Sequence, residues 1–171
     1  MAVVKGNSQG SQANGAGGNG NGRSTWPSRG KGYSVPGSGV TFPPLRNRLK
    51  ALVVDDMSAC YRYERAILQS FGVETDVAET GEEAVEIFAN GAYYDLVLIE
   101  KYLTIYAMTG VEATRRIRGM GFQGKMLAVT AFTSQSDRFE FFDAGIDAYL
   151  IKPITHEMIW PYLLQIDNQI A

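Results

Sequence analysis

Five side chains that could take part in chemistry follow apolar segments of the chain. Asp55 and Asp56 come after LVV, Glu100 ends DLVLIE, Thr130 ends MLAVT, and Lys152 follows AYLI. Carboxylates accept hydrogen bonds and bind cations, a hydroxyl donates and accepts, and an ammonium group donates to anions. Glu100 alone has four interpretations: a nucleophile, a metal ligand, a fixed negative charge, or the remnant of a lost site.

The elements around these residues predict where they lie. Short apolar segments typical of strands are each followed by a helical pattern, at residues 51–54, 73–78, 96–99, 126–130 and 148–151. Strands that are apolar on both faces, with single amphipathic helices between them, form parallel sheets covered on both sides. The predicted fold class is therefore α/β, a doubly wound five-stranded parallel sheet.

Ligands of doubly wound folds bind beyond the carboxyl ends of the strands. We therefore expect Asp55, Asp56, Glu100, Thr130 and Lys152 at one edge of the sheet. Each of them alone has an ordinary structural explanation, but their joint placement predicts a site. Three carboxylates at one place repel one another, so without a cation one of them should hold a proton or pair with Lys152.

The segments that carry these residues resemble one protein family. LVVDD, YDLVLIE, LAVTA and AYLIKP stand where receiver domains of two-component response regulators have their acidic pair, acceptor strand, hydroxyl and lysine. The resemblance spans roughly residues 48–168 and implies a flavodoxin-like fold with strand order 2-1-3-4-5. GVEATRRIR is most similar to short plant receivers of the phosphorelay type.

A metal site is the first implication of the resemblance. Asp55 and Asp56 would hold Mg²⁺, directly or through water, and the backbone carbonyl of Tyr102 would be a further ligand. Mg²⁺ prefers an octahedron of oxygen ligands with few carboxylates, which suits this set.

A phosphoryl site and a switch are the second implication. Thr130 would hydrogen-bond one phosphoryl oxygen and Lys152 would neutralise another. Tyr149, three residues before the lysine, would be the aromatic side chain that moves inward on activation.

Glu100 departs from the family pattern, which has Asp at this acceptor position. The extra methylene adds about 1.5 Å, and a misplacement of about 1 Å can lower a rate on the order of 100-fold. We therefore expect that Glu100 is not efficiently phosphorylated, and that its carboxylate reaches Lys152 and Thr130 as a partial mimic of phospho-aspartate. The next loop also departs from the pattern, because it is longer and Thr104 replaces a proline.

These residues predict a two-component phosphorelay signalling module, a pseudo-receiver that is not an enzyme. Its expected partner is a histidine-containing phosphotransfer protein, another receiver or a kinase. One alternative is a Mg²⁺-dependent receiver that accepts phosphate and has phosphohistidine phosphatase activity toward transfer proteins, and weak activity of this kind stays open. Another alternative is a scaffold with a relic site, in which the N-terminal tail is the working part.

The N-terminal part of the chain has a different composition. Eleven of the nineteen glycines lie in the first 47 residues, and residues 1–50 carry seven Lys and Arg but no Asp or Glu. Residues 51–171 carry nine basic and 18 acidic residues. A Gly/Asn/Ser-rich segment buries too little apolar surface to offset the entropy of ordering it. We therefore predict a disordered basic tail over residues 1–47 and a receiver-like domain over residues 48–171.

Cysteine usage and hydropathy indicate the compartment. Cys60 is the only cysteine, so no intrachain disulfide can form. The sequence contains neither a signal peptide nor an apolar run of roughly 20 residues. We expect a cytoplasmic or nuclear protein, or both, with no membrane contact. Because no DNA-reading domain follows the receiver-like part, direct DNA binding is not expected.

Three details concern the last two helices. Pro161 predicts that the last helix either starts late or bends, because proline removes an interior hydrogen bond. His156 is expected at the surface or in the first turn of that helix. At least two of Phe139, Phe141 and Phe142 are expected to be buried or half-buried.

Overall fold

Five parallel strands form the main sheet. A computed structural model of the chain describes residues 31–103, 108–131 and 134–170. Its sheet has the order β4-β3-β5-β6-β7, with β3 (Lys50–Val54), β4 (Glu74–Ala78), β5 (Leu96–Ile99), β6 (Lys125–Thr130) and β7 (Ala148–Ile151). Counted along the chain from β3, this order is 2-1-3-4-5, so the predicted doubly wound fold is confirmed.

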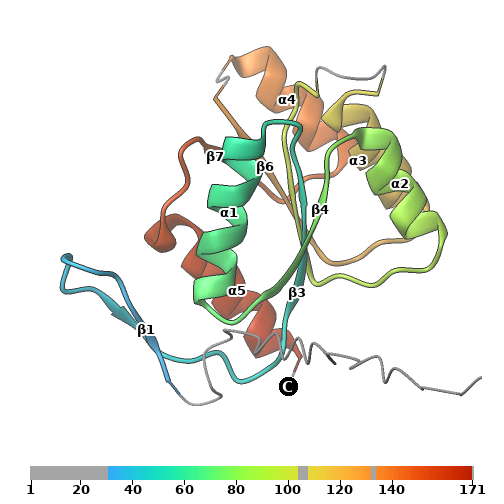
Figure 1. The fold of residues 1–171 in the computed structure, drawn as a ribbon. Helices are drawn as coiled ribbons and strands as arrows, with labels where there is room; N and C mark the ends of the chain where they lie inside the picture. Colours follow the sequence, from blue (N-terminus) through green and yellow to red (C-terminus); the bar gives the residue numbers. More distant parts are fainter. Residues whose placement is uncertain (1–30, 104–107, 132–133, 171) are drawn as a thin grey trace, which may run out of the picture.

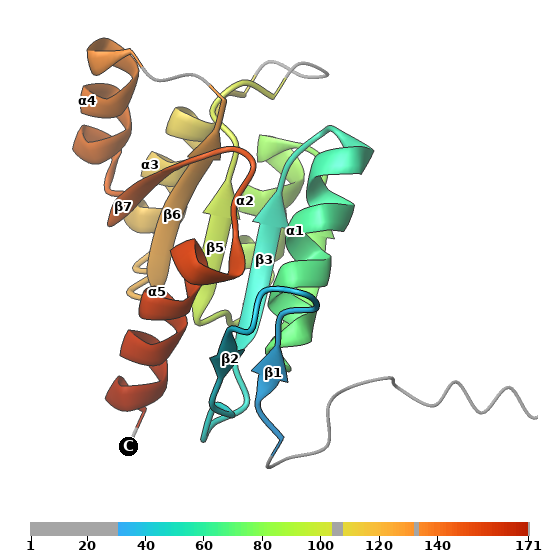
Figure 2. The ribbon, with the colours of Figure 1, turned by 90° about the vertical axis from the view of Figure 1, so that its left-hand side faces the viewer.

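Helices cover both faces of this sheet (Figures 1 and 2). One face carries α1 (Ser58–Ser70) and α5 (His156–Gln169), and the other carries α2 (Gly81–Ala89), α3 (Gly110–Gly119) and α4 (Gln135–Ala144). Side chains alternate along β3, so that Ala51 and Val53 face α1 and α5 whereas Leu52 and Val54 face the other core. This double coverage explains why the strands are apolar on both faces.

Residues 31–47 correct the predicted tail boundary. They contain an antiparallel hairpin of β1 (Tyr33–Ser34) and β2 (Thr41–Phe42), which lies between α1 and α5 at the lower end of the view in Figure 2. Phe42 is buried, and the Tyr33 ring stacks on His156 with 4.8 Å between ring centroids. The sequence predicted disorder here because the segment is rich in glycine on average, and only a few of its side chains pack against the domain. The rest of the predicted tail, residues 1–30, lies outside the described residues.

Asp167 fastens the chain that follows the hairpin. This buried carboxylate of α5 accepts the backbone amide of Arg46 at 3.0 Å and that of Asn47 at 2.8 Å. Burial would raise the pKa of Asp167, but these bonds outweigh it and lower that pKa below its ordinary value. The ordered domain therefore begins before the position that the sequence indicated.

The last two helices differ from their predictions in two respects. α5 begins at His156 and runs through Pro161, so a late start is wrong. On α4, Phe141 is buried but Phe139 and Phe142 are 74% and 49% exposed, so the expectation for these rings is also wrong. α4 touches the core along a narrow face, because Phe141 and Ala144 are its buried residues.

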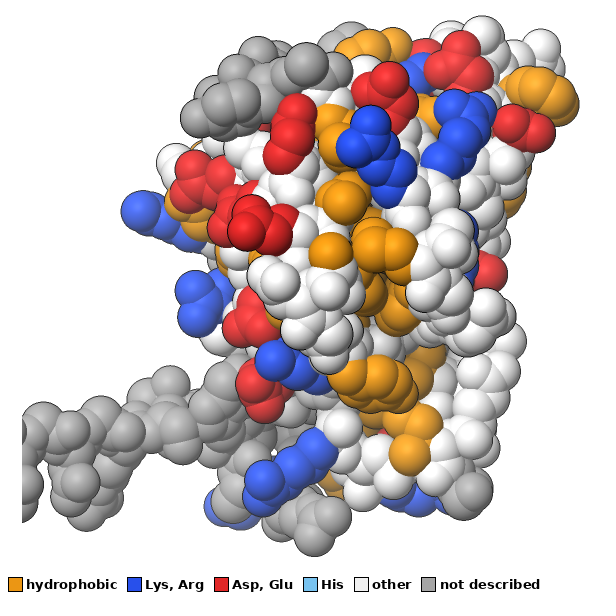
Figure 3. All heavy atoms as spheres, turned by 90° about the vertical axis from the view of Figure 1, so that its right-hand side faces the viewer, with side chains coloured by type: hydrophobic (Ala, Val, Ile, Leu, Met, Phe, Trp, Pro, Cys, Tyr) orange, Lys and Arg blue, Asp and Glu red, His pale blue; other side chains and the backbone are white. Residues whose placement is uncertain are grey.

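The face over α2 and α3 mixes side chains of different kinds. Apolar groups form a strip between interspersed acidic and basic groups (Figure 3). Among the described residues, no helix is both long enough and apolar enough to span a membrane.

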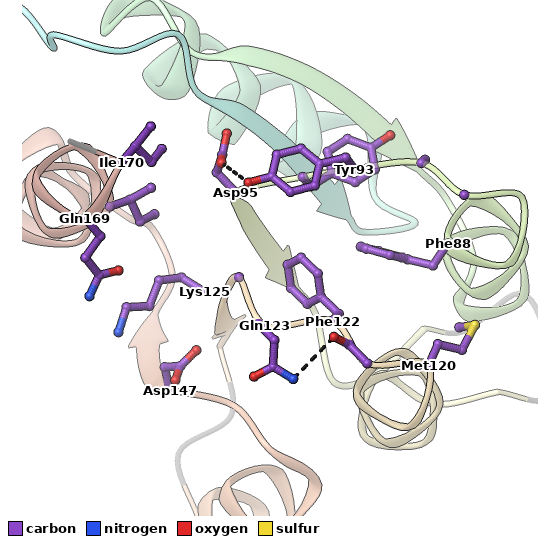
Figure 4. Close-up of a pocket in the computed structure, with 16 residues that line it drawn as sticks. Phe88, Tyr93, Asp95, Met120, Phe122, Gln123, Lys125, Asp147, Gln169 and Ile170 are labelled. Carbon is purple, nitrogen blue, oxygen red and sulfur yellow. Dashed lines mark hydrogen bonds between the residues drawn. The ribbon is translucent and has the colours of Figure 1, made fainter.

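A cleft of about 680 Å³ lies at the amino ends of the strands, opposite the edge where the predicted site residues lie (Figure 4). Asp95, Lys125 and Asp147, at the starts of β5, β6 and β7, are among its lining residues. The Asp95 carboxylate accepts the Lys50 amide at 2.8 Å and the Tyr93 hydroxyl at 2.9 Å. The predicted site residues do not line this cleft. Asp95 has a structural role, because its carboxylate holds the first residue of β3 and Tyr93.

Candidate functional site

The carboxyl ends of the strands bring the predicted residues to one edge. Asp55 follows β3, Glu100 follows β5, Thr130 ends β6 and Lys152 follows β7. Backbone bonds continue the strand pairing beyond the strands themselves, because the Glu100 amide donates to the Val54 carbonyl at 2.9 Å and the Lys152 amide to the Thr130 carbonyl at 3.0 Å. Their side chains therefore start from neighbouring points on one rim.

Lys152 joins two of the acids. Its ammonium group hydrogen-bonds Oδ2 of Asp55 and lies 2.8 Å from Oε2 of Glu100. All three side chains are largely buried. Burial alone would lower the pKa of Lys152, but the bonds with Asp55 and Glu100 outweigh it and raise that pKa. The structure thus contains the expected pair between Glu100 and Lys152.

The second oxygen of Glu100 turns back onto its own loop. Oε1 accepts the backbone amides of Lys101 at 2.7 Å and Tyr102 at 3.2 Å. Gly110 closes this loop tightly: its amide donates to the Lys101 carbonyl at 2.9 Å, and a Cβ at position 110 would lie 2.0 Å from the Glu100 carbonyl oxygen. Both carboxylate oxygens of Glu100 are therefore held, one by an ammonium group and one by amides.

The acidic pair after β3 occupies two environments. Asp55 is buried, and its Oδ1 accepts the Met57 amide at 2.8 Å. Burial raises the pKa of Asp55, and the bond from Lys152 offsets this only in part. Asp56 is half-buried beside it. The ammonium group of Lys152 thus contacts Asp55 of this pair and Glu100.

The other predicted residues lie around this group. Thr130 is fully buried at the end of β6, and Tyr149 is half-buried on β7, with its ring 6.2 Å from that of Phe141. The exposed Tyr102 donates its hydroxyl to Asp137 of α4 at 3.0 Å. Thr104, in the predicted longer loop, lies outside the described residues. The expected contact of Glu100 with Thr130 stays a prediction.

Glu64 is an acid of this region that the sequence reading missed. It lies on α1 and is only 3% exposed. Burial raises its pKa to about 8; Lys152 opposes this shift, and Asp55 and Glu100 add to it. The signal was present, because Glu64, Ile67, Leu68 and Phe71 have the spacing of one helix face.

Lys101 is the second residue that the sequence reading missed. Its side chain is 7% exposed and its ammonium group contacts Asp137 and Glu140 of α4. Nothing in the spacing of a lysine directly after Glu100 indicates a partner 36 positions away.

The acids at this edge suit a divalent cation by charge and by type. Asp55, Asp56 and Glu100 carry three carboxylates, and the ammonium group of Lys152 contacts Asp55 and Glu100. In the part of the chain that the structure describes, no three His, Cys, Asp or Glu side chains are already arranged as a metal-binding group. A Mg²⁺ site needs only one or two carboxylates, with other oxygen ligands, so the fit rests on the two aspartates.

The chain is similar to known proteins. The sequence profile of the response regulator receiver domain matches residues 51–163. Two-component response regulator 24 of Arabidopsis thaliana is 36% identical over 109 residues, covering 64% of this chain and 77% of its own. Two-component response regulator ORR41 of Oryza sativa subsp. japonica is 38% identical over 117 residues, covering 67% and 91%.

A solved structure agrees with these sequence relatives. The receiver domain of sensor histidine kinase PA1611 from Pseudomonas aeruginosa PAO1, described with a magnesium ion coordinated in its active site cleft, is 28% identical, with a TM-score of 0.63. The match covers 71% of this chain and 99% of that one. The profile covers more than half of the chain and the plant and structural relatives agree with it, so the chain belongs to the response regulator receiver domain family.

Proposed function

We propose that this receiver domain acts in a phosphorelay as a pseudo-receiver, with Glu100 as a standing negative charge where receivers accept phosphate. The observation that carries this proposal is the contact of 2.8 Å between Glu100 and the buried Lys152. Lys152 is the residue that would neutralise a phosphoryl oxygen, and in this chain Glu100 already supplies its anion.

The length of the Glu100 side chain and the existing contacts of its two carboxylate oxygens both act against its phosphorylation. An in-line attack on phosphohistidine depends on positioning and on charge stabilisation by a cation and a lysine. The added methylene moves the attacking oxygen by about 1.5 Å. In addition, one oxygen pairs with Lys152 and the other accepts two amides. An attack would need to break these bonds first.

The bias toward an active form should be partial. A hydrogen bond to a charged group contributes about 1.5–3 kcal/mol, whereas moving a switch from about 1:99 to 99:1 takes roughly 5.5 kcal/mol. A carboxylate also carries less charge than a phosphoryl group. Glu100 therefore shifts the positions of Thr130 and Tyr149 only part of the way.

This mimicry has a direct test in the absence of any phosphodonor. Glu100→Asp shortens the side chain by one methylene, and Glu100→Gln keeps the size of the side chain but removes its charge. We expect both variants to change the NMR signals of Thr130 and Tyr149 relative to the native chain and in the same direction, because both weaken the contact with Lys152. Signals that stay identical in all three proteins would refute the mimicry.

The proposed partner is a histidine-containing phosphotransfer protein, another receiver or a kinase. A domain that binds a phosphorylated transfer protein without accepting its phosphate would compete with functional receivers. Adding the native chain to a transfer reaction between such a protein and a functional receiver should slow that reaction. An increase in free phosphate during this experiment would instead support the phosphohistidine phosphatase alternative.

Mg²⁺ would be held by Asp55 and Asp56, with the Tyr102 carbonyl as a further ligand. The cation would supply charge stabilisation at this edge when bound. Lys152 opposes it, because its ammonium group already binds an oxygen of Asp55. In this chain the lysine and a bound cation would therefore compete for the negative charge of Asp55.

Removing Lys152 should accordingly strengthen Mg²⁺ binding. We expect Lys152→Met to raise the Mg²⁺ affinity about tenfold, because a positive charge close to the metal ligands is lost. Calorimetric titration measures the change. Lys125→Met is the matched control, since Lys125 begins β6 at the opposite edge of the sheet, and it should leave the affinity unchanged. Equal or weaker binding by Lys152→Met would contradict the competition.

A further inference from the structure

Lys101 directly follows the glutamate at the acceptor position, yet its side chain ends on another element. Its ammonium group contacts Asp137 and lies 2.9 Å from Glu140, both on α4. Burial alone would lower the pKa of Lys101, but the bonds to these two acids outweigh it and raise that pKa. Lys101 is thus a charged, buried anchor between the loop after β5 and α4.

Asp137 collects several donors at the start of α4. Besides the Lys101 ammonium group, its carboxylate accepts the Tyr102 hydroxyl at 3.0 Å and the Ser134 hydroxyl at 2.5 Å. The hydrogen bond from Lys101, followed by that from Ser134, lowers the pKa of Asp137 to about 2. A negative charge is also favourable in the first turn of a helix. These contacts fasten the first turn of α4 to residues 101 and 102.

The Glu100 carboxylate binds the backbone of the two residues that follow it. Its Oε1 accepts the amides of Lys101 and Tyr102, and the side chains of both residues reach Asp137. If the Glu100 carboxylate moves, the backbone amides of Lys101 and Tyr102 lose these hydrogen bonds, and the directions of the two side chains can change.

The apolar packing of α4 against the sheet is sparse. Phe141 and Ala144 are its buried residues, and two further phenylalanines are exposed. α4 also contacts the predicted switch residue, because the Arg138 guanidinium lies 5.2 Å from the centre of the Tyr149 ring. A movement of α4 would therefore change the contacts of the Tyr149 ring.

We propose that Lys101 is a positioning residue that transmits the state of the Glu100 site to α4, through its buried contacts with Asp137 and Glu140. This inference rests on the proposed function, because it takes Glu100 as the standing charge that fixes the loop. It adds the route by which that charge controls α4 and, through α4, the surroundings of Tyr149.

A double-mutant cycle tests the coupling, because intermediate position alone does not establish it. Hydrogen exchange of the α4 amides is compared in the native chain, Glu100→Gln, Lys101→Met and the double variant. We expect about tenfold faster exchange in each single variant and no further increase in the double variant. Lys101→Arg keeps the charge and should restore most of the protection. Arg115→Met is the matched control, because Arg115 also pairs with α4, at Asp143, but in an exposed position, and its exchange should match the native chain.

The outcomes separate this inference from the proposed function. If Glu100→Gln changes the signals of Thr130 but leaves α4 exchange as in the native chain, the route through Lys101 is refuted and the standing charge is retained. Independent, multiplicative effects of the two substitutions also refute the route. If Glu100→Gln changes neither signal, the proposed function itself fails.

Discussion

Glu100→Asp should accept phosphate from a phosphorylated histidine-containing transfer protein at least about 100-fold faster than the native chain. The shorter side chain withdraws the attacking oxygen by about 1.5 Å, and a misplacement of about 1 Å costs on the order of 100-fold in rate. It also frees Lys152 to neutralise the incoming phosphoryl group, since the native contact of 2.8 Å would be lost. Transfer of radiolabelled phosphate over time measures both rates.

Two variants make this comparison specific. Glu100→Gln has no carboxylate and should accept no phosphate, which shows that the gain in Glu100→Asp comes from the carboxylate. Combining Glu100→Asp with Lys152→Met should remove most of the gain, because the lysine is then absent. Equal transfer to the native chain and to Glu100→Asp would contradict the argument from reach.

Replacing Glu64 by Gln should stabilise the protein by about 3 kcal/mol at pH 7. Glu64 is almost completely buried, and burial raises its pKa to about 8. At pH 7 the folded protein therefore keeps a proton on this residue, whereas the unfolded chain has released it. Each pKa unit between the two states corresponds to about 1.36 kcal/mol. Gln has nearly the same volume and no proton to release.

The sign of this effect gives it a characteristic pH dependence. The folded pKa of Glu64 is raised, so its contribution to stability is fully present below the ordinary pKa of 4.5 and is lost as the pH rises toward about 8. Urea unfolding with EDTA should give similar stabilities for the native chain and Glu64→Gln near pH 4.5, and diverging ones up to pH 8. Glu86→Gln, on the exposed side of α2, is the control and should show no such divergence. A constant difference at all pH values would contradict the assignment to Glu64.

The sequence predicts the sheet well because its strands are buried on both faces. A short apolar segment such as residues 96–99 is stable mainly as a strand buried on both faces. The helices between successive strands make the connections parallel. Once the strand order is known, the meeting of Asp55, Glu100 and Lys152 follows from geometry alone. That is why residues nearly a hundred positions apart could be assigned to one edge.

The features that were missed depend on contacts that no periodic pattern expresses. The segment of residues 31–47 is anchored by a few side chains such as Tyr33 and Phe42, but it is otherwise rich in glycine, so its composition resembles that of a tail. Lys101 reaches Asp137 of α4, 36 positions further along the chain, from a loop whose amides bind Glu100. Glu64 was visible as a member of an apolar helix face, but its raised pKa depends on burial beside Asp55 and Glu100.

The chemical state of Glu100 in the native chain is the most direct test of the account. The native chain is incubated with a phosphorylated histidine-containing transfer protein and Mg²⁺, and hydroxylamine-sensitive acyl phosphate is located by mass spectrometry. We predict that no phosphate appears on Glu100, while the Asp variant carries it at the same position under the same conditions. A hydroxylamine-sensitive phosphate on Glu100 of the native chain would contradict the role of this residue as a standing charge.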